Sequence, residues 1–252
     1  MFMCAIHKIN AREMRLKYSM TMMDFTFKRF AIAQDRCAMK LTTDSILLGS
    51  WAEGGKRILD IGTGCGILAL MMAQRFEMAS VLAIDIDAEA VKQAQENVEL
   101  SPFAERIKTQ CTALQNLCVE TPFDCIVSNP PFFENSLKNN DQRTTVARHT
   151  DALPFSALVK HANRLLSDDG IFSVIVPQES LQSIRVEISV SGLFIHRITE
   201  IRTTPNKSPK RCLIACSKQN RNALQRDEIL LFDEQGNRTE KYQNLTRDFY
   251  LK

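Results

Sequence analysis

A four-residue turn, Asn129–Phe132 (Asn-Pro-Pro-Phe), carries the most specific chemistry in this sequence. It follows the apolar run Asp124–Ser128, which predicts a buried strand. Two consecutive prolines form a stiff turn whose nitrogens cannot donate hydrogen bonds, so the turn fixes the Asn129 side chain and leaves the Pro130 carbonyl as an acceptor. An amide oxygen and a carbonyl oxygen can together hold both hydrogens of a planar amine. We therefore expect the turn to bind an amine whose lone pair is delocalised.

Holding both hydrogens would pull such a nitrogen toward tetrahedral geometry and aim its lone pair at an electrophile. Phe132 adds an aromatic face on which a base can stack, typically worth about 1–3 kcal/mol. No strong base is required, because positioning in a near-attack geometry supplies most of the catalysis. The alternative interpretation is an ordinary tight turn with a core phenylalanine. The predicted catalytic residues are Asn129, Pro130, Pro131 and Phe132.

A glycine-rich segment, Asp60–Gly66 (Asp-Ile-Gly-Thr-Gly-Cys-Gly), predicts a cofactor loop between a strand and a helix. Glycines let the backbone turn sharply and approach a ligand without a Cβ in the way. Asp85 ends the next predicted strand, where a carboxylate can accept both hydroxyls of a ribose. The loop differs from the dinucleotide fingerprint G-x-G-x-x-G, because an acid leads it and its glycines alternate. The Asp60 carboxylate would repel a pyrophosphate but suits the positive charge of S-adenosylmethionine. An ordinary glycine-rich turn is the alternative.

The elements that must position these motifs alternate along the chain. Apolar runs predict strands at Arg57–Ile61, Val81–Asp85, Arg106–Cys111, Asp124–Ser128 and Ile171–Val176. Helical spacing of apolar residues predicts helices around Ile67–Met72, Val91–Val98, Leu158–Leu166 and Leu181–Ile188. This alternation indicates an α/β fold with a parallel sheet and helices on both faces. Both motifs follow strand ends, so we expect them to meet at the carboxyl edge, where ligands bind in such sheets.

The last third of the sequence predicts antiparallel strands. The runs Leu193–Ile201 and Cys212–Cys216 are joined by Arg202–Arg211, which holds two prolines and no helical pattern, so we expect a hairpin closing the sheet. Ile229–Asp233 with its Gly236-Asn237 turn predicts a further short edge hairpin. We expect one domain over residues 25–252. Residues 1–24 are either a short arm or lie upstream of the true start.

Composition narrows the class of protein. The 252 residues include 44% hydrophobic and 24% charged residues, enough for one α/β domain with a sizeable core. The eight cysteines form no C-x-x-C pair and no zinc spacing, so we expect a cytoplasmic protein with reduced thiols and no metal. No apolar run reaches membrane-span length, and no signal peptide is apparent. We expect a monomer without a membrane partner.

The net charge of +3 gives no global argument for nucleic acid, so the argument depends on where basic residues cluster. The hairpin connector contains no acid, and a second basic cluster follows the Asn-Pro-Pro-Phe turn. Phosphates favour such clusters, although a solvated charged loop is the general alternative. The predicted nucleic-acid contacts are Arg143, Arg148, Arg202, Lys207, Lys210 and Arg211.

With these motifs the chain resembles the Rossmann-like class I S-adenosylmethionine-dependent methyltransferases, among which Asn-Pro-Pro-aromatic marks the branch acting on planar amino groups. Its terminal blocks, Phe25–Phe30, Met39–Gly49 and Tyr242–Leu251, are similar to those of the bacterial tRNA1(Val) (adenine37-N6)-methyltransferases. Segments around Ala147–His149 and Ser208–Arg211 are similar too. That family methylates the adenosine just 3′ of the anticodon. The resemblance implies a mostly parallel seven-stranded sheet whose last strand is antiparallel, and a tRNA anticodon stem-loop as partner.

The resemblance also assigns roles by position. Asp60, Gly62 and Gly64 would line the cofactor, Asp85 would hold its ribose, and Lys40 and Thr43 would lie over the site. In full, the expected cofactor-binding residues are Lys40, Thr43, Asp60, Gly62, Thr63, Gly64, Gly66, Asp85, Ile86 and Asn129. Two departures stand out. Phe132 replaces the tyrosine of many relatives, and Thr112-Ala113 lacks the acid that often contacts the cofactor adenine.

Three other functions share parts of this pattern. Glutamine methyltransferases that modify release factors use the same turn, but they carry an N-terminal helical domain for which too few residues precede this core. DNA adenine methyltransferases usually bring a target-recognition domain, which we do not find in the sequence. A non-catalytic RNA-binding module of the same fold is disfavoured, because Asp60, Gly62, Gly64, Asp85 and Asn129 are all present.

Overall fold

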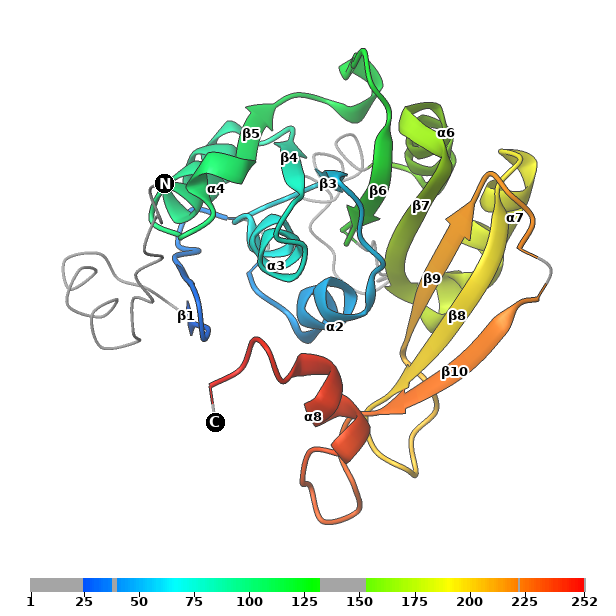
Figure 1. Ribbon diagram of the computed structural model, residues 1–252. Helices are drawn as coiled ribbons and strands as arrows, with labels where there is room; N and C mark the ends of the chain where they lie inside the picture. Colours follow the sequence, from blue (N-terminus) through cyan, green and yellow to red (C-terminus); the bar gives the residue numbers. More distant parts are fainter. Residues whose placement is uncertain (1–24, 38–39, 132–152, 222, 252) are drawn as a thin grey trace, which may run out of the picture.

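An open, twisted sheet organises the computed structural model, which describes residues 25–37, 40–131, 153–221 and 223–251 (Figure 1). Within these ranges eight strands follow the order β10-β8-β9-β7-β6-β3-β4-β5. Their bounds are β3 Arg57–Ile61, β4 Ser80–Asp85, β5 Ile107–Cys111, β6 Phe123–Ser128, β7 Leu166–Pro177, β8 Phe194–Arg202, β9 Arg211–Ser217 and β10 Gln225–Leu230. Only β9 runs antiparallel to its neighbours among these strands. The expected α/β class is confirmed, with one strand more than the resemblance implied.

Helices cover both faces of the sheet, as the alternation predicted. They are α2 Thr43–Trp51, α3 Ile67–Arg75, α4 Ala88–Glu99, α6 Phe155–Leu165, α7 Leu181–Val190 and α8 Glu240–Thr246. Three-residue 3-10 turns lie at η1 Ala104–Arg106, η2 Leu114–Asn116 and η3 Gln178–Ser180. In β6, Cys125 and Val127 pack with α2, α3 and α4, whereas Ile126 packs with α6 and α7. The period of two along a strand therefore divides the apolar residues between two buried layers.

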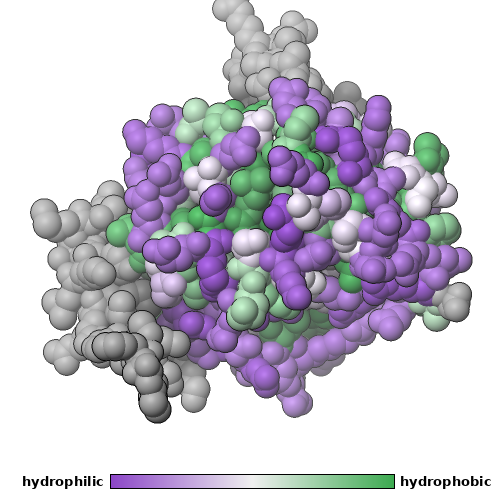
Figure 2. All heavy atoms as spheres, turned by 45° about the horizontal axis from the view of Figure 1, so that its top comes forward, coloured by the Kyte–Doolittle hydropathy of each residue, from purple (hydrophilic) through white to green (hydrophobic). Residues whose placement is uncertain are grey.

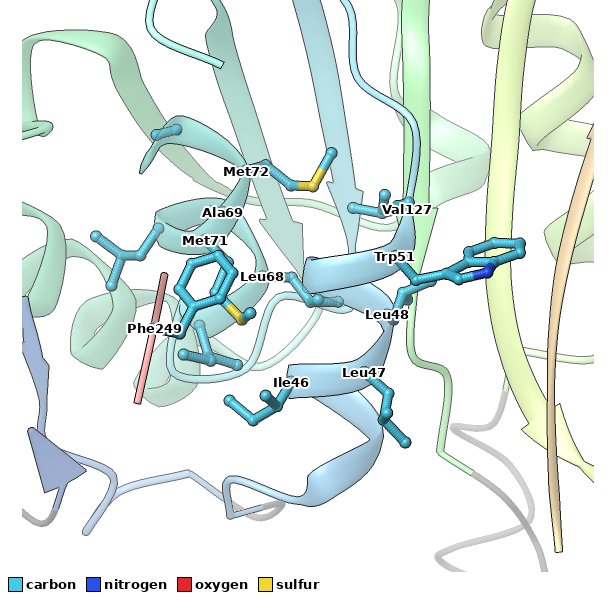
Figure 3. Close-up of a cluster of buried hydrophobic side chains, with 14 of the residues drawn as sticks. Ile46, Leu47, Leu48, Trp51, Leu68, Ala69, Met71, Met72, Val127 and Phe249 are labelled. Carbon is cyan, nitrogen blue, oxygen red and sulfur yellow. The ribbon is translucent and has the colours of Figure 1, made fainter. Parts of the chain in front are cut away.

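Helices α2 and α3 pack against each other in one buried apolar layer (Figure 3). Ile46 and Leu48 of α2 lie against Leu68 and Met71 of α3, and all four side chains are buried. Phe249, near the C-terminus, packs into the same layer. Because this layer is dense and apolar, the first turn of α2 has a fixed position relative to the loop.

The terminal segments pack together beside this layer. The short strands β1 Phe25–Thr26 and β2 Ala31–Ile32 form a separate antiparallel pair. The Phe27 ring lies 4.7 Å from that of Phe30 and 6.4 Å from that of Tyr250 between centroids. The Lys28 amide donates to the Phe249 carbonyl over 2.9 Å. Two of the three terminal blocks that carried the family resemblance, Phe25–Phe30 and Tyr242–Leu251, are thus in direct contact.

The C-terminal part of the sheet contains both expected hairpins and a parallel edge strand, β10, that was not predicted. The hairpin of β8 and β9 is present, with its loop at the carboxyl edge, since Arg211 pairs with Pro177 at the end of β7. The expected edge hairpin at Ile229–Asp233 is found in short form, as an antiparallel bridge between Phe232 and Arg238 around the Gly236 turn. Only Ile229 and Leu230 of that segment belong to β10, which pairs in parallel with β8, and the Asp233 amide donates to the Asn237 carbonyl across the turn over 2.9 Å.

Two predicted boundaries also shift. Arg106 lies in η1 and not in β5, and its guanidinium donates to the carbonyls of Ala73, Phe76 and Ala79 around the end of α3. Leu166 begins β7 and does not extend α6.

Some apolar side chains remain exposed, and Figure 2 shows a face where hydrophilic residues predominate with apolar residues visible between them. The expected arm at residues 1–24 lies outside the described residues.

Candidate active site

The glycines of the loop between β3 and α3 serve two different structural purposes. Gly62, Gly64 and Gly66 all have positive φ, at 71°, 54° and 83°. A Cβ at Gly62 or Gly64 would meet no atom of the described residues within 4 Å, whereas one at Gly66 would lie 3.2 Å from the Ala94 Cβ. Gly66 therefore permits close packing of the loop on α4. Gly62 and Gly64 instead face open space, where a ligand can approach the backbone.

Asp60 stabilises this loop by hydrogen bonds to its buried carboxylate. Its Oδ2 accepts hydrogen bonds from the Thr63 hydroxyl over 2.6 Å and from the Ala69 amide over 3.1 Å. The side chain is fully buried, and Oδ1 has no partner among the described residues. Burial raises the pKa of Asp60 to about 7, against the lowering effect of these two hydrogen bonds. Asp60 was expected to line the cofactor, but in the structure it contacts the loop and α3.

Asp85, the last residue of β4, is hydrogen-bonded to the glycine loop. Its Oδ2 accepts from the Gly64 amide over 2.9 Å, and its Oδ1 accepts from the Asp87 amide over 3.1 Å. The side chain remains half-exposed at a cavity wall. The carboxylate thus has a fixed direction and keeps lone pairs that a hydroxyl group can reach.

A cavity of about 480 Å³ opens beside Asp85 and the loop. Ile86 contributes an apolar wall and is 56% exposed, and Pro130 and Pro131 also line the cavity. This size and mixed lining suit an adenosine-sized ligand. Gln115 and His161 also line it, although neither was predicted from the sequence. They lie in segments distant from both motifs, so no local pattern marked them.

A second, smaller cavity shares Gly62 and Gly64 with the first. Its wall includes Asn129, together with Lys40, Ser45 and Thr63. The loop therefore separates an adenosine-sized space from a narrow space beside Asn129. An elongated ligand lying across the two glycines would reach both.

Asn129 is 7% exposed and has an asymmetric environment. Its Nδ2 donates to the Ser45 Oγ of α2 over 3.0 Å. Its Oδ1 is buried and has no hydrogen-bond partner among the described residues. A buried carbonyl oxygen without a donor is costly, so this atom is available to a donor from a ligand. This is the atom that the sequence predicts as an acceptor.

The remaining predicted residues vary in their placement. Lys40 lines the smaller cavity, whereas Thr43 begins α2, is exposed and lines neither of the two cavities. Phe132, Arg143 and Arg148 lie outside the described residues.

Asn97 was not predicted from the sequence, and it supports the site. Its Nδ2 donates to the carbonyls of Cys65 and Ala33, and so joins the cofactor loop to the N-terminal segment.

The hairpin loop at residues 203–210 is less uniformly basic in the structure than in the sequence. Arg202 pairs with Glu228 of β10 over 2.9 Å, and Arg211 pairs with Asp44 of α2 over 2.8 Å. Lys207 and Lys210 are exposed and have no ion pair within the described part of the chain. These two lysines are therefore the cations that the hairpin offers to a phosphate.

Neither a metal centre nor a membrane span is found in the described ranges. No group of three or more His, Cys, Asp or Glu side chains is arranged to hold a metal ion there. None of the described helices combines the length and apolarity that crossing a membrane requires.

The chain is similar to known proteins in sequence and in fold. The family model described as "Methyltransferase small domain" matches residues 43–193. A tRNA1(Val) (adenine(37)-N6)-methyltransferase of Phocaeicola vulgatus is 44% identical over 229 residues, which cover 90% of this chain and 97% of that protein. One from Trichodesmium erythraeum is 42% identical over 238 residues, which cover 90% and 98%. Among solved structures, a predicted O-methyltransferase from Agrobacterium tumefaciens matches with a TM-score of 0.64 and 23% identity, covering 81% of this chain and 96% of that chain. This last likeness concerns the fold alone.

Proposed function

The chain belongs to the family of the tRNA1(Val) (adenine(37)-N6)-methyltransferases, and we propose that it methylates N6 of adenosine 37 in that tRNA. It is an S-adenosylmethionine-dependent enzyme of the Rossmann-like type. The observation that carries the proposed chemistry is that Asn129 Oδ1, beside the glycine loop, is buried and has no hydrogen-bond partner among the described residues.

The residues present fit the cofactor. Gly62 and Gly64 leave open space where a Cβ would stand, and the Asp85 carboxylate is directed at the larger cavity by two backbone amides. We propose that Asp85 accepts the ribose hydroxyls and that Ile86 packs against the adenine. S-adenosylmethionine supplies a methyl group on a positively charged sulfur and leaves as a neutral thioether.

The chain's own residues position the target amine. Asn129 Oδ1 accepts one hydrogen of the exocyclic amine, and the Pro130 carbonyl accepts the other. Both bonds favour a pyramidal nitrogen whose lone pair points toward the methyl group, so geometry and not a strong base drives the step. When the nitrogen gains the methyl group it loses one proton, which Asn129 cannot retain and solvent receives.

Lys207 and Lys210 support binding of the RNA backbone beside the site, because their ammonium groups are exposed at the carboxyl edge of the sheet. An anticodon-loop nucleotide is already unpaired, so moving it into a pocket costs less than extruding one from a duplex. A tRNA substrate agrees with the proposed cytoplasmic location. The proposed monomer and the single domain over residues 25–252 stay predictions.

The deciding experiment offers the purified chain labelled S-adenosylmethionine and an unmodified anticodon stem-loop with adenosine at position 37. We expect N6-methyladenosine by mass spectrometry. A stem-loop with guanosine at that position is the control and should remain unlabelled. Parallel reactions with a release factor and with duplex DNA test the rival substrates. Label in either of these, with none in the stem-loop, would contradict the proposed function.

A further inference from the structure

A buried serine beside Asn129 has no role in the chemistry derived so far. Ser45 is the third residue of α2, it is 6% exposed, and its Oγ lies 3.0 Å from Asn129 Nδ2. The two residues are 84 positions apart in sequence, so the fold alone brings them together. Ser45 also lines the smaller cavity with Asn129 and Gly62.

The amide of Asn129 has two ends of nearly equal shape and opposite chemistry. The oxygen end accepts hydrogen bonds, and the nitrogen end only donates them. An incoming amine brings hydrogens, so it is held only where the oxygen end faces it. The two prolines after Asn129 fix the backbone, but they cannot decide which way the amide is turned.

In the structure Ser45 contacts only the nitrogen end of this amide. Its oxygen accepts from Nδ2, which leaves Oδ1 as the end without a partner among the described residues. We propose that Ser45 is a positioning residue for methyl transfer, which holds the Asn129 amide with its oxygen toward the target amine. This inference rests on the proposed function and adds a residue to its mechanism.

Residues around Ser45 fix its position, so that it cannot move with the Asn129 amide if that amide rotates. Its neighbours Ile46 and Leu47 are each 1% exposed and belong to the dense layer between α2 and α3. On its other side, Asp44 accepts from Arg211 Nε over 2.8 Å and so ties the helix start to β9. The hydroxyl is therefore presented from a rigid element, which is what precise orientation of a reacting group requires.

The same helix provides a matched control. Ser50 is also 6% exposed, and its Oγ has no hydrogen-bond partner within the described residues. Ser45→Ala and Ser50→Ala thus remove the same atom at the same burial, but only the first removes a contact with Asn129. Ser45→Thr keeps the hydroxyl and tests for rescue.

The experiment measures kcat, KM for the adenosine stem-loop and Kd for S-adenosylmethionine in the wild-type chain and the three variants. We expect Ser45→Ala to lower kcat about tenfold, the effect of losing one hydrogen bond in the transition state, while the cofactor Kd changes less than about twofold. Ser50→Ala and Ser45→Thr should keep kcat within about threefold of wild type.

Two results would overturn the inference. One is an equal kcat for Ser45→Ala and Ser50→Ala. The other is a Ser45→Ala defect confined to the cofactor Kd, which would make Ser45 part of the cofactor wall. If Ser45→Ala does not fold, Ser45→Cys fills the same space with a weak acceptor and should lower kcat in the same way; an unchanged kcat would contradict the inference. An inactive wild-type chain would instead contradict the proposed function, and the inference with it.

Discussion

Arg211 donates from Nε to Asp44 Oδ2 over 2.8 Å, and this ion pair joins the first residue of β9 to the first turn of α2. The Asp44 side chain is 16% exposed and that of Arg211 is 32% exposed, so water screens the pair only in part. Asp44 precedes Ser45, which contacts Asn129. The hairpin proposed to meet RNA is thus tied to the helix that orients the proposed catalytic amide.

Breaking this ion pair should affect stability and catalysis together. We expect Asp44→Asn to lower the free energy of unfolding by about 1 kcal/mol, discounted for partial exposure, and to lower kcat/KM several-fold. A double-mutant cycle with Arg211→Gln measures the coupling. If the two single effects are simply additive in the double variant, the pair does not couple the hairpin to α2.

Removing the proposed acceptor should stop turnover without releasing the cofactor. Asn129→Ala is expected to lower kcat by about 100-fold or more, because the amine loses its positioning partner, while Kd for S-adenosylmethionine changes less than about threefold. Asn163→Ala is a matched control. Its amide also donates from Nδ2, to Ser191, and leaves Oδ1 buried without a partner in the described structure. Comparable activity of the two variants would refute the role of Asn129.

An alanine at Gly62 should cost cofactor affinity beyond its cost in stability. Gly62 and Gly236 have φ values of 71° and 82°, and a Cβ at either would meet no atom of the described residues within 4 Å. Both alanine variants should therefore lose about 1–2 kcal/mol of unfolding free energy from backbone strain. Only Gly62→Ala should weaken cofactor binding, by about tenfold or more, as measured by calorimetry. Equal affinities in both variants would remove Gly62 from the cofactor site.

The buried Asp60 should make stability depend on pH. Burial raises its pKa from 3.8 to about 7, so between these values the folded state binds the proton that the unfolded state has released. The stability contribution is therefore present below pH 4 and is lost as the pH rises through about 7, by about 1.4 kcal/mol for each pH unit. The unfolding free energy of wild type minus that of Asp60→Asn should fall over this window. A flat difference would show that Asp60 does not titrate there.

The exposed lysines of the hairpin should contribute electrostatically to RNA binding. We expect Lys207→Ala with Lys210→Ala to weaken stem-loop binding and to reduce the slope of log K against log salt by about 1 for each phosphate that is no longer neutralised. Lys56→Ala with Lys108→Ala removes two exposed lysines outside the hairpin, one just before β3 and one in β5, and serves as the control. Cofactor affinity should stay unchanged in both double variants. An identical salt slope for the two would exclude the hairpin lysines from RNA binding.

The sequence alone determined the α/β class, most strands and helices, and the meeting of the Asp60–Gly66 loop with the Asn129 turn at one sheet edge. These features follow from local causes: the period of apolar residues, glycines that permit positive φ, and prolines that stiffen a turn. The positions of Asp85 and Asn129 at strand ends follow from the same patterns.

The tertiary structure decided which distant groups meet, because a residue's partners depend on how the elements pack. Arg211 and Asp44 are 167 positions apart, and no local pattern indicates that the hairpin cations Arg202 and Arg211 find acids on β10 and α2. The parallel pairing of β10, the full burial of Asp60 and the Ser45 contact with Asn129 are of the same kind. The turn motif supplies the amide, and the packing of α2 against the sheet gives that amide its direction.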